Sequence, residues 1–180
     1  MLKKFYSLLL RVLGWKSTLK INLPAKCVIC VAPHTSNWDL FIGMIFYKSL
    51  IGKPHFLMKK DWFFFPLGYF FKSLGGIPVN RGKKTFMSEQ LAKLFDTKKY
   101  FHLAITPEGT RKKNALWKSG FYYIAQSAKV PIVLAYIDYA KKEIGAFNNF
   151  YPTGNVDKDI EEIKQYYRNV KGKHPAEFAM

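Results

Sequence analysis

A histidine and an aspartate five residues apart, His34 and Asp39, follow the apolar run of residues 27–33. We predict that this run is a strand leading through a polar turn into a helix, which would deliver both side chains to the carboxyl edge of a sheet. Ser36 as helix N-cap, with Asp39 three residues later, resembles a capping box. Asp39 could then fix the imidazole tautomer, leaving the other ring nitrogen to take a proton from a hydroxyl. The alternative is that Asp39 only caps the helix and His34 is a surface turn residue.

Two later segments carry polar groups beside short apolar strands. Residues 101–105 read as a buried strand, followed by Thr-Pro-Glu-Gly-Thr-Arg at 106–111, and Gly-Gly-Ile-Pro-Val-Asn-Arg stands at 75–81. Glycine permits close approach of the backbone to a ligand, and arginine offers a fork suited to phosphate oxygens. The simpler alternatives are that Glu108 and Arg111 pair only with each other and that the glycine pair forms only a turn.

In this order and spacing, the segments resemble the glycerolipid acyltransferase family that contains bacterial 1-acyl-glycerol-3-phosphate acyltransferases. The resemblance extends from about Val28 to about Tyr136. The four motifs of that family are matched, in chain order, by His34 and Asp39, by Gly76, Ile77 and Arg81, by residues 107–111, and by residues 130–133.

The sequence departs from the usual residues of that family beside the motifs, at Pro33, Asn80, Thr106 and Leu134. Asn80 and Thr106 flank the segments whose arginines are expected to bind phosphate. Of all the expected features of the function, the head group of the acceptor is therefore the one that the resemblance specifies least. The histidine and aspartate of the first motif are both present.

The resemblance implies direct transfer of an acyl group from a thioester to a hydroxyl. His34 would act as general base and Asp39 would orient it, without a covalent acyl-enzyme; consistent with this, the chain has no Gly-x-Ser-x-Gly segment. Lys59 matches a basic residue of the family and could stabilise the thioester oxyanion, or it could equally be a solvated or lipid-facing lysine. The phosphate and glycerol of the acceptor would be positioned by Arg81, Glu108, Gly109, Thr110 and Arg111.

The substrates are also expectations from the resemblance. The acyl donor would be a thioester of acyl carrier protein or of coenzyme A, and the acceptor a lysophospholipid, above all 1-acyl-glycerol-3-phosphate (lysophosphatidic acid). A lyso-aminolipid acceptor, such as an ornithine or glycine lipid precursor, is an alternative, because an arginine fork serves a carboxylate equally well.

Cysteine and histidine usage argues against other chemistries. Cys27 and Cys30 spell C-x-x-C, but three residues apart on a strand they would face opposite ways, so we expect buried thiols in a reducing compartment. The four histidines show no metal-ligand spacing. We therefore predict no metal and no tightly bound cofactor.

The chain is strongly basic, with 29 Lys and Arg against 12 Asp and Glu and a net charge of +17. An anionic partner is implied: an anionic membrane surface or acidic acyl carrier protein. A basic module that binds nucleic acid is the alternative from a different class. No nucleic acid is expected, because the aromatic residues cluster in one hydrophobic segment instead of alternating with Lys and Arg.

Two segments are candidates for contact with lipid. Residues 1–20 are predicted to form an amphipathic membrane-docking helix, separate from an acyltransferase domain at 21–180; packing on that domain and a signal peptide are the alternatives. The second segment, 62–71, holds seven aromatics that cannot all be core. No run is long enough to span a bilayer, so we expect peripheral attachment to the cytoplasmic side of the inner membrane. The residues expected at lipid or acyl chain are Phe5, Leu9, Trp62, Phe63, Phe64 and Phe65.

The 180 residues suffice for one α/β domain. We predict a mixed, largely parallel sheet flanked by helices, with an amino-terminal interfacial helix. Strands are expected at 26–32, 55–58, 77–79, 101–106, 131–138 and 144–150, and helices at 2–16, 37–50, 62–73, 84–97, 117–128 and 157–169.

Overall fold

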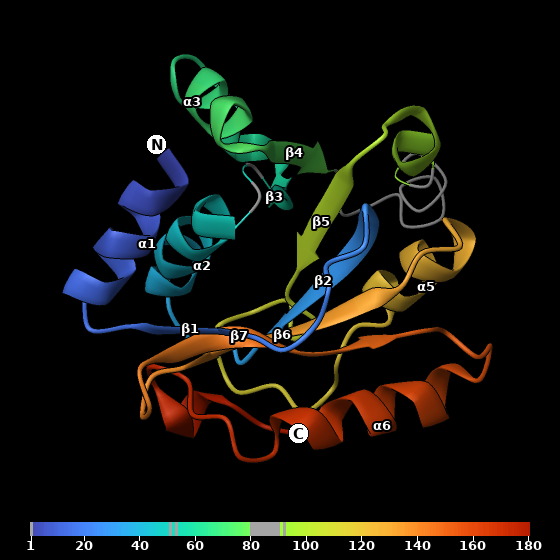
Figure 1. Ribbon diagram of the computed structural model, residues 1–180. Helices are drawn as coiled ribbons and strands as arrows, with labels where there is room; N and C mark the ends of the chain where they lie inside the picture. Colours follow the sequence, from blue (N-terminus) through green and yellow to red (C-terminus); the bar gives the residue numbers. More distant parts are fainter. Residues whose placement is uncertain (1, 51, 53, 80–90, 92) are drawn as a thin grey trace.

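Within the residues that the computed structural model describes (2–50, 52, 54–79, 91 and 93–180), seven strands form one sheet in the order β1-β7-β6-β2-β5-β3-β4 (Figure 1). The strands from β6 to β4 in that order are mutually parallel, β7 is antiparallel to β6, and β1 is parallel to β7. The predicted mixed, largely parallel sheet is thus confirmed. The strands are β1 (Lys16–Leu19), β2 (Lys26–Ala32), β3 (His55–Lys59), β4 (Gly76–Val79), β5 (Phe101–Ile105), β6 (Ile132–Asp138) and β7 (Glu143–Phe150).

Helices cover both faces of the sheet. On one face α1 (Leu2–Val12) packs beside α2 (Trp38–Leu50), and on the other lie α5 (Gly120–Ser127) and α6 (Val156–Tyr167), as Figure 1 shows. A further helix, α3 (Leu67–Leu74), stands near β4, and single 3-10 turns occupy Lys60–Trp62 and Pro175–Glu177.

Strand β2 supplies side chains to the hydrophobic core on both faces. Val28 and Cys30 belong to the core under α5 and α6, whereas Cys27 and Ile29 pack with Tyr47 of α2. The two cysteines therefore face opposite sides of the sheet, as predicted from their spacing. Burial raises the pKa of the Cys27 thiol to about 12, and that of Cys30 further still.

The neighbouring strands β2 and β5 are followed by helices on opposite faces. The chain passes from β2 to β3 through α2 and from β5 to β6 through α5. In α/β sheets, such a reversal opens a crevice at the carboxyl ends of the two strands, where ligands usually bind. The residues after β2 and β5 are those that the sequence singles out, beginning with His34 and Thr106.

Three element predictions differ from the structure. The first helix ends at Val12 instead of residue 16, because Gly14 takes a left-handed conformation (φ 77°) and the chain then forms β1, which was not predicted. The helix placed at 62–73 begins only at Leu67, since Pro66 disfavours helical backbone in the residue before it. The helix placed at 117–128 begins at Gly120. Of the helix at 84–97, residues 84–90 and 92 lie outside the described part of the chain, and the rest is helical.

Candidate active site

The polar turn after β2 brings His34 and Asp39 together. His34 lies in the turn and Asp39 in the first turn of α2, and the imidazole Nδ1 lies 3.0 Å from Oδ2 of the carboxylate. Because a carboxylate only accepts, Nδ1 carries the proton and Nε2 of the neutral ring keeps its lone pair. No described residue makes a hydrogen bond to Nε2, and 22% of the His34 side chain is exposed. The pair thus has the geometry of a base that faces outward, supported from within.

The Asp39 carboxylate is buried and hydrogen-bonded on both oxygens. Oδ2 also accepts from the main-chain N–H groups of Thr35 and Ser36, at 3.0 and 2.9 Å. The bond to Ser36 is the reciprocal half of the predicted capping box, although the Ser36 hydroxyl accepts from Trp38 and not from Asp39. Oδ1 accepts from the hydroxyl of Tyr139, at 2.7 Å.

Glu108 ties the segment after β5 to the turn after β2. Its Oε1 accepts from the main-chain N–H of His34 at 2.8 Å, and the side chain is 2% exposed. Burial, together with the charge of Asp39, raises the pKa of Glu108 to about 7, although the bond from His34 opposes the shift. The carboxyl is therefore directed at the His34 turn and not at Arg111, which answers the alternative that Glu108 and Arg111 merely pair.

The glycine and arginine of the same segment lie beside the pair. Arg111 is exposed and its Nη1 donates to Oδ1 of Asn37, a residue of the His34 turn. Gly109 has a φ of 65°, and a Cβ there would lie 2.7 Å from Nζ of Lys118. The Lys118 side chain thus passes directly over the glycine, which places a second cation at this edge of the sheet.

The end of the chain packs against the same turn. The hydroxyl of Thr35 accepts from the main-chain N–H of His174 at 3.1 Å. A Cβ on Gly172 would lie 2.7 Å from that hydroxyl, so only glycine fits the contact. Lys173 lies with Nζ 5.0 Å from the ring centre of Trp38. The segment 172–174 therefore forms one wall of the site.

The sequence model of the family described as Acyltransferase matches residues 16–138. This span covers well over half of the chain and includes His34, Asp39, Glu108 and Arg111. The chain belongs to the Acyltransferase family. Membership of an acyltransferase family, predicted from four short motifs, is thereby confirmed.

The fold of this acyltransferase also resembles a solved structure, that of the 1-acyl-sn-glycerophosphate (LPA) acyltransferase PlsC from Thermotoga maritima. The TM-score is 0.60 at 17% sequence identity, over 92% of this chain and 76% of that chain. At such identity the likeness concerns the fold. No curated protein matches the chain.

Lys59 is a predicted site residue that the structure does not join to the pair. Lys59 forms an ion pair with Asp61 and makes no hydrogen bond to His34, Asp39 or Glu108. Arg81 lies outside the described residues, whereas Gly76 and Ile77 of the same motif form part of β4.

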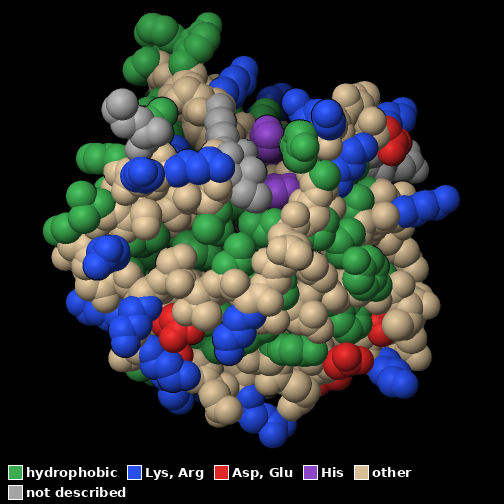
Figure 2. Space-filling model, viewed as in Figure 1, with side chains coloured by type: hydrophobic (Ala, Val, Ile, Leu, Met, Phe, Trp, Pro, Cys, Tyr) green, Lys and Arg blue, Asp and Glu red, His purple; other side chains and the backbone are tan. Residues whose placement is uncertain are grey.

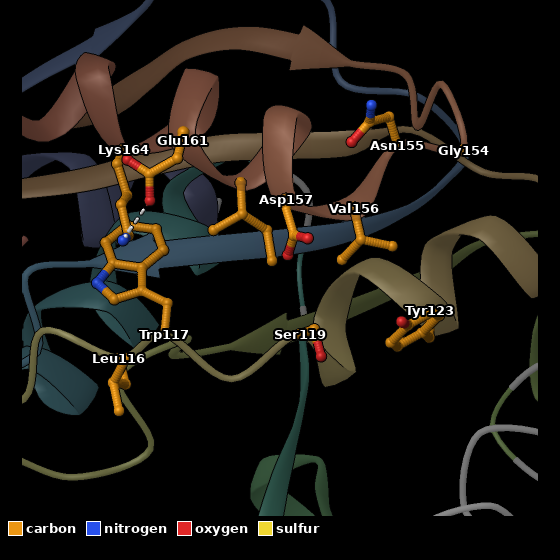
Figure 3. A pocket seen from close by; sticks show the side chains of 11 residues that line it. Leu116, Trp117, Ser119, Tyr123, Gly154, Asn155, Val156, Asp157, Glu161 and Lys164 are labelled. Atoms are coloured by element: carbon orange, nitrogen blue, oxygen red, sulfur yellow. Dashed lines mark hydrogen bonds and ion pairs between the residues drawn. The ribbon is translucent and has the colours of Figure 1, made fainter.

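A cavity in the described structure is separate from this site. It measures about 720 Å³ and lies between α5 and α6, lined by Trp117, Tyr123 and Lys164 among others (Figure 3). None of the predicted site residues lines it. The edge of the sheet at the carboxyl ends of β2 and β5, where the motif residues converge, is the better candidate for the active site of the acyltransferase.

Sequence reasoning missed Tyr139, Lys118 and the segment 172–174. Tyr139 follows β6 directly, and β6 neighbours β2, so its position at a strand end was a usable signal. Lys118 carries no local mark of function. It reaches this segment only in the folded chain, where its main-chain N–H donates to the carbonyl of Pro107 at 2.8 Å.

Proposed function

We propose that this acyltransferase moves a fatty acyl group from an acyl thioester to the free hydroxyl of 1-acyl-glycerol-3-phosphate. The observation that carries the proposal is the His34–Asp39 pair at the carboxyl ends of β2 and β5, whose imidazole is partly exposed and makes no described hydrogen bond through Nε2. The membership of the family supports acyl transfer, and the exposed Arg111 beside the pair supports an anionic acceptor.

His34 acts as general base in this proposal. Nε2 takes the proton of the acceptor hydroxyl as its oxygen attacks the thioester carbonyl carbon. The tetrahedral intermediate then collapses, the carbon–sulfur bond breaks, and the thiolate leaves with the proton returned by the imidazolium. Asp39 stabilises the imidazolium between these two steps, and a positioned base of this kind typically contributes about 10²–10⁴ in rate.

Arg111 holds the phosphate of the acceptor in this proposal. Its guanidinium is exposed, and its hydrogen bond to Asn37 fixes it beside the His34 turn. Arg81 is proposed as a second phosphate contact on the strength of the motif alone. The Lys118 side chain, which lies over Gly109, adds positive charge there.

The acyltransferase attaches peripherally to the cytoplasmic side of an anionic membrane in this proposal. Apolar side chains lie exposed over α1 and α3, and Figure 2 shows them gathered at the upper left of the molecule, where Figure 1 places these helices. Lys and Arg far outnumber Asp and Glu on the face in view. Such a patch with a basic surround suits an anionic interface. The most exposed apolar residues of α1, of α3 and of the segment 62–65 just before α3 are Leu2, Phe5, Leu8, Val12, Trp62, Phe64, Phe65, Tyr69 and Phe70.

Two findings qualify the picture of lipid contact. No helix among the described residues is long and apolar enough to cross a membrane. Leu9 and Phe63 are half-buried, and Phe63 packs against Phe71 with ring centres 6.2 Å apart. Among the residues expected to contact lipid, the exposed ones Phe5, Trp62, Phe64 and Phe65 are therefore proposed to make most of that contact.

The proposal is tested by transfer of radiolabelled palmitate from acyl carrier protein and from coenzyme A to lysophosphatidic acid. A lyso-aminolipid acceptor runs in parallel, and His34→Ala is the control. We expect phosphatidic acid from the native enzyme and none above background from the variant. Transfer to the aminolipid alone would keep the mechanism and overturn the acceptor, whereas transfer to neither, with either thioester, would overturn both.

A further inference from the structure

Tyr139 is the described residue that binds Oδ1 of the Asp39 carboxylate. Its hydroxyl donates to Oδ1 at 2.7 Å, while the three other hydrogen bonds of Asp39, from His34, Thr35 and Ser36, all fall on Oδ2. Without Tyr139, the described contacts would hold this buried carboxylate along one edge only. The orientation of the imidazole depends on the orientation of that carboxylate.

Tyr139 is itself held from two sides. Its main-chain N–H donates to the carbonyl of Lys171 at 2.8 Å, and its ring packs edge to face on buried Trp15, with ring centres 5.0 Å apart. Burial and the neighbouring Asp39 raise the pKa of the Tyr139 hydroxyl far above its ordinary value, so the hydroxyl remains a donor at any working pH. A fixed donor aimed at one oxygen is suited to orient the carboxylate.

We propose that Tyr139 is a positioning residue that orients Asp39 and tunes the basicity of His34. The inference rests on the proposed role of His34 as general base. A hydroxyl bonded to Oδ1 draws part of the carboxylate charge away from the imidazolium. Loss of that hydroxyl leaves more negative charge on the carboxylate oxygen that faces the imidazolium. The imidazolium then keeps its proton to higher pH. The same loss frees the carboxylate to turn, which slows proton transfer.

The test compares Tyr139→Phe with Tyr136→Phe. The first variant keeps the ring that packs on Trp15 and removes only the hydroxyl. The second removes a comparable bond, from the Tyr136 hydroxyl on β6 to Oε1 of Glu143, a carboxylate that makes no described hydrogen bond to His34 or Asp39. Tyr136 is buried and its bond also ends on a carboxylate, so it controls for a purely structural loss.

The first readout needs no substrate. Diethyl pyrocarbonate modifies the neutral imidazole. The rate of modification of His34 is measured at a series of pH values by mass spectrometry of the peptide that contains His34. We expect the midpoint of this curve to move about 0.3–1 pH unit higher in Tyr139→Phe, and Tyr136→Phe to follow the native curve. An unmoved midpoint, or the same movement in both variants, would overturn the inference.

The second readout is steady-state acyl transfer. We expect kcat to fall about 5- to 30-fold in Tyr139→Phe, with the KM values of thioester and acceptor within about twofold of native. An unchanged kcat, or a loss confined to KM, would count against Tyr139. If lysophosphatidic acid is not a substrate but the modification curve moves as expected, the proposed acceptor fails and the role of Tyr139 stands.

Discussion

The main-chain N–H of His34 donates to the side chain of Glu108 across 74 positions of sequence, at 2.8 Å. This bond joins the first and third motifs, because β2 and β5 are parallel neighbours whose carboxyl ends lie side by side. Glu108 therefore holds the backbone of the turn that contains His34. If this buried carboxyl also contacts the acceptor, it does so while it accepts the hydrogen bond from the His34 N–H.

Glu108 should make the stability of the enzyme depend on pH. Its pKa is raised from 4.5 to about 7 in the folded chain, so between these values the folded state binds a proton that the unfolded state releases. The free energy of unfolding should therefore fall as pH rises from about 4.5 to about 7, and it should level off above that range. Glu108 contributes up to about 3 kcal/mol to this fall. Glu108→Gln keeps an oxygen for the His34 N–H and should remove this part of the slope. Urea unfolding of both proteins from pH 5 to pH 8 measures the difference.

The control for that comparison is Glu177→Gln. Glu177 is exposed and accepts from the main-chain N–H of Lys113. Its variant should follow the native curve of stability against pH. Parallel curves for native enzyme and Glu108→Gln would contradict the assignment of this titration to Glu108.

His34→Ala should lower kcat by about 10²–10⁴ while leaving the fold intact. The side chain is partly exposed, and Asp39 keeps its bonds from Thr35, Ser36 and Tyr139. Acyl transfer and thermal unfolding are measured on the same preparation. We expect a large loss of acyl transfer and little change in Tm.

His174→Ala is the matched control for the histidine. The His174 side chain is exposed, and its contact with the turn is made by the main-chain N–H to Thr35. This variant should retain kcat within about twofold, as surface substitutions usually do. Retained turnover in His34→Ala, or an equal loss in His174→Ala, would sink the assignment of the base.

The sequence was sufficient to predict the pairing of His34 with Asp39, because both lie within one strand, turn and helix. The segment containing Glu108 could be placed at the same edge for a related reason, since each apolar strand ends directly before its motif. What the sequence could not supply was the partner of each polar atom, such as the bond from His34 to Glu108.

Contacts made only by tertiary packing could not be predicted. Tyr139 meets Asp39 across 100 positions, and although the tyrosine stands at a strand end, no local pattern marks its contact with Asp39. The strand β1, Lys-Ser-Thr-Leu at Lys16–Leu19, shows little apolar alternation, and it exists because it pairs with β7. That pairing brings the carbonyl of Thr18 so close to Gly145 that no side chain would fit there.

Arg111→Ala should weaken handling of the acceptor more than chemistry. Loss of a fork that holds phosphate should raise the acceptor KM about 10- to 100-fold and leave the KM of the thioester within about threefold. Arg111→Lys keeps the charge without the fork and should fall between native enzyme and the alanine variant. Kinetics with a short-chain lysophosphatidic acid at about 0.15 M salt separate these effects from membrane binding.

Lys112→Ala controls for charge in the same segment. Lys112 is equally exposed and neighbours Arg111, but its described contact is made by the main-chain N–H, to the hydroxyl of Thr110. Its variant should leave the acceptor KM near native. An acceptor KM that is unchanged in Arg111→Ala, or raised equally in Lys112→Ala, would remove Arg111 from the phosphate site.

Phe65→Ser and Leu8→Ser should each weaken membrane binding about 5- to 20-fold without loss of fold, because both side chains are exposed, by 82% and 58%, on the apolar patch of α3 and α1. Co-sedimentation with phosphatidylglycerol vesicles measures binding, and added salt should weaken it further as the basic charge is screened. Tyr151→Ser removes a comparably exposed aromatic, 67% exposed, between β7 and α6 and should bind like the native enzyme. Native binding by both patch variants, or an equal loss in Tyr151→Ser, would show that lipid is met by another surface.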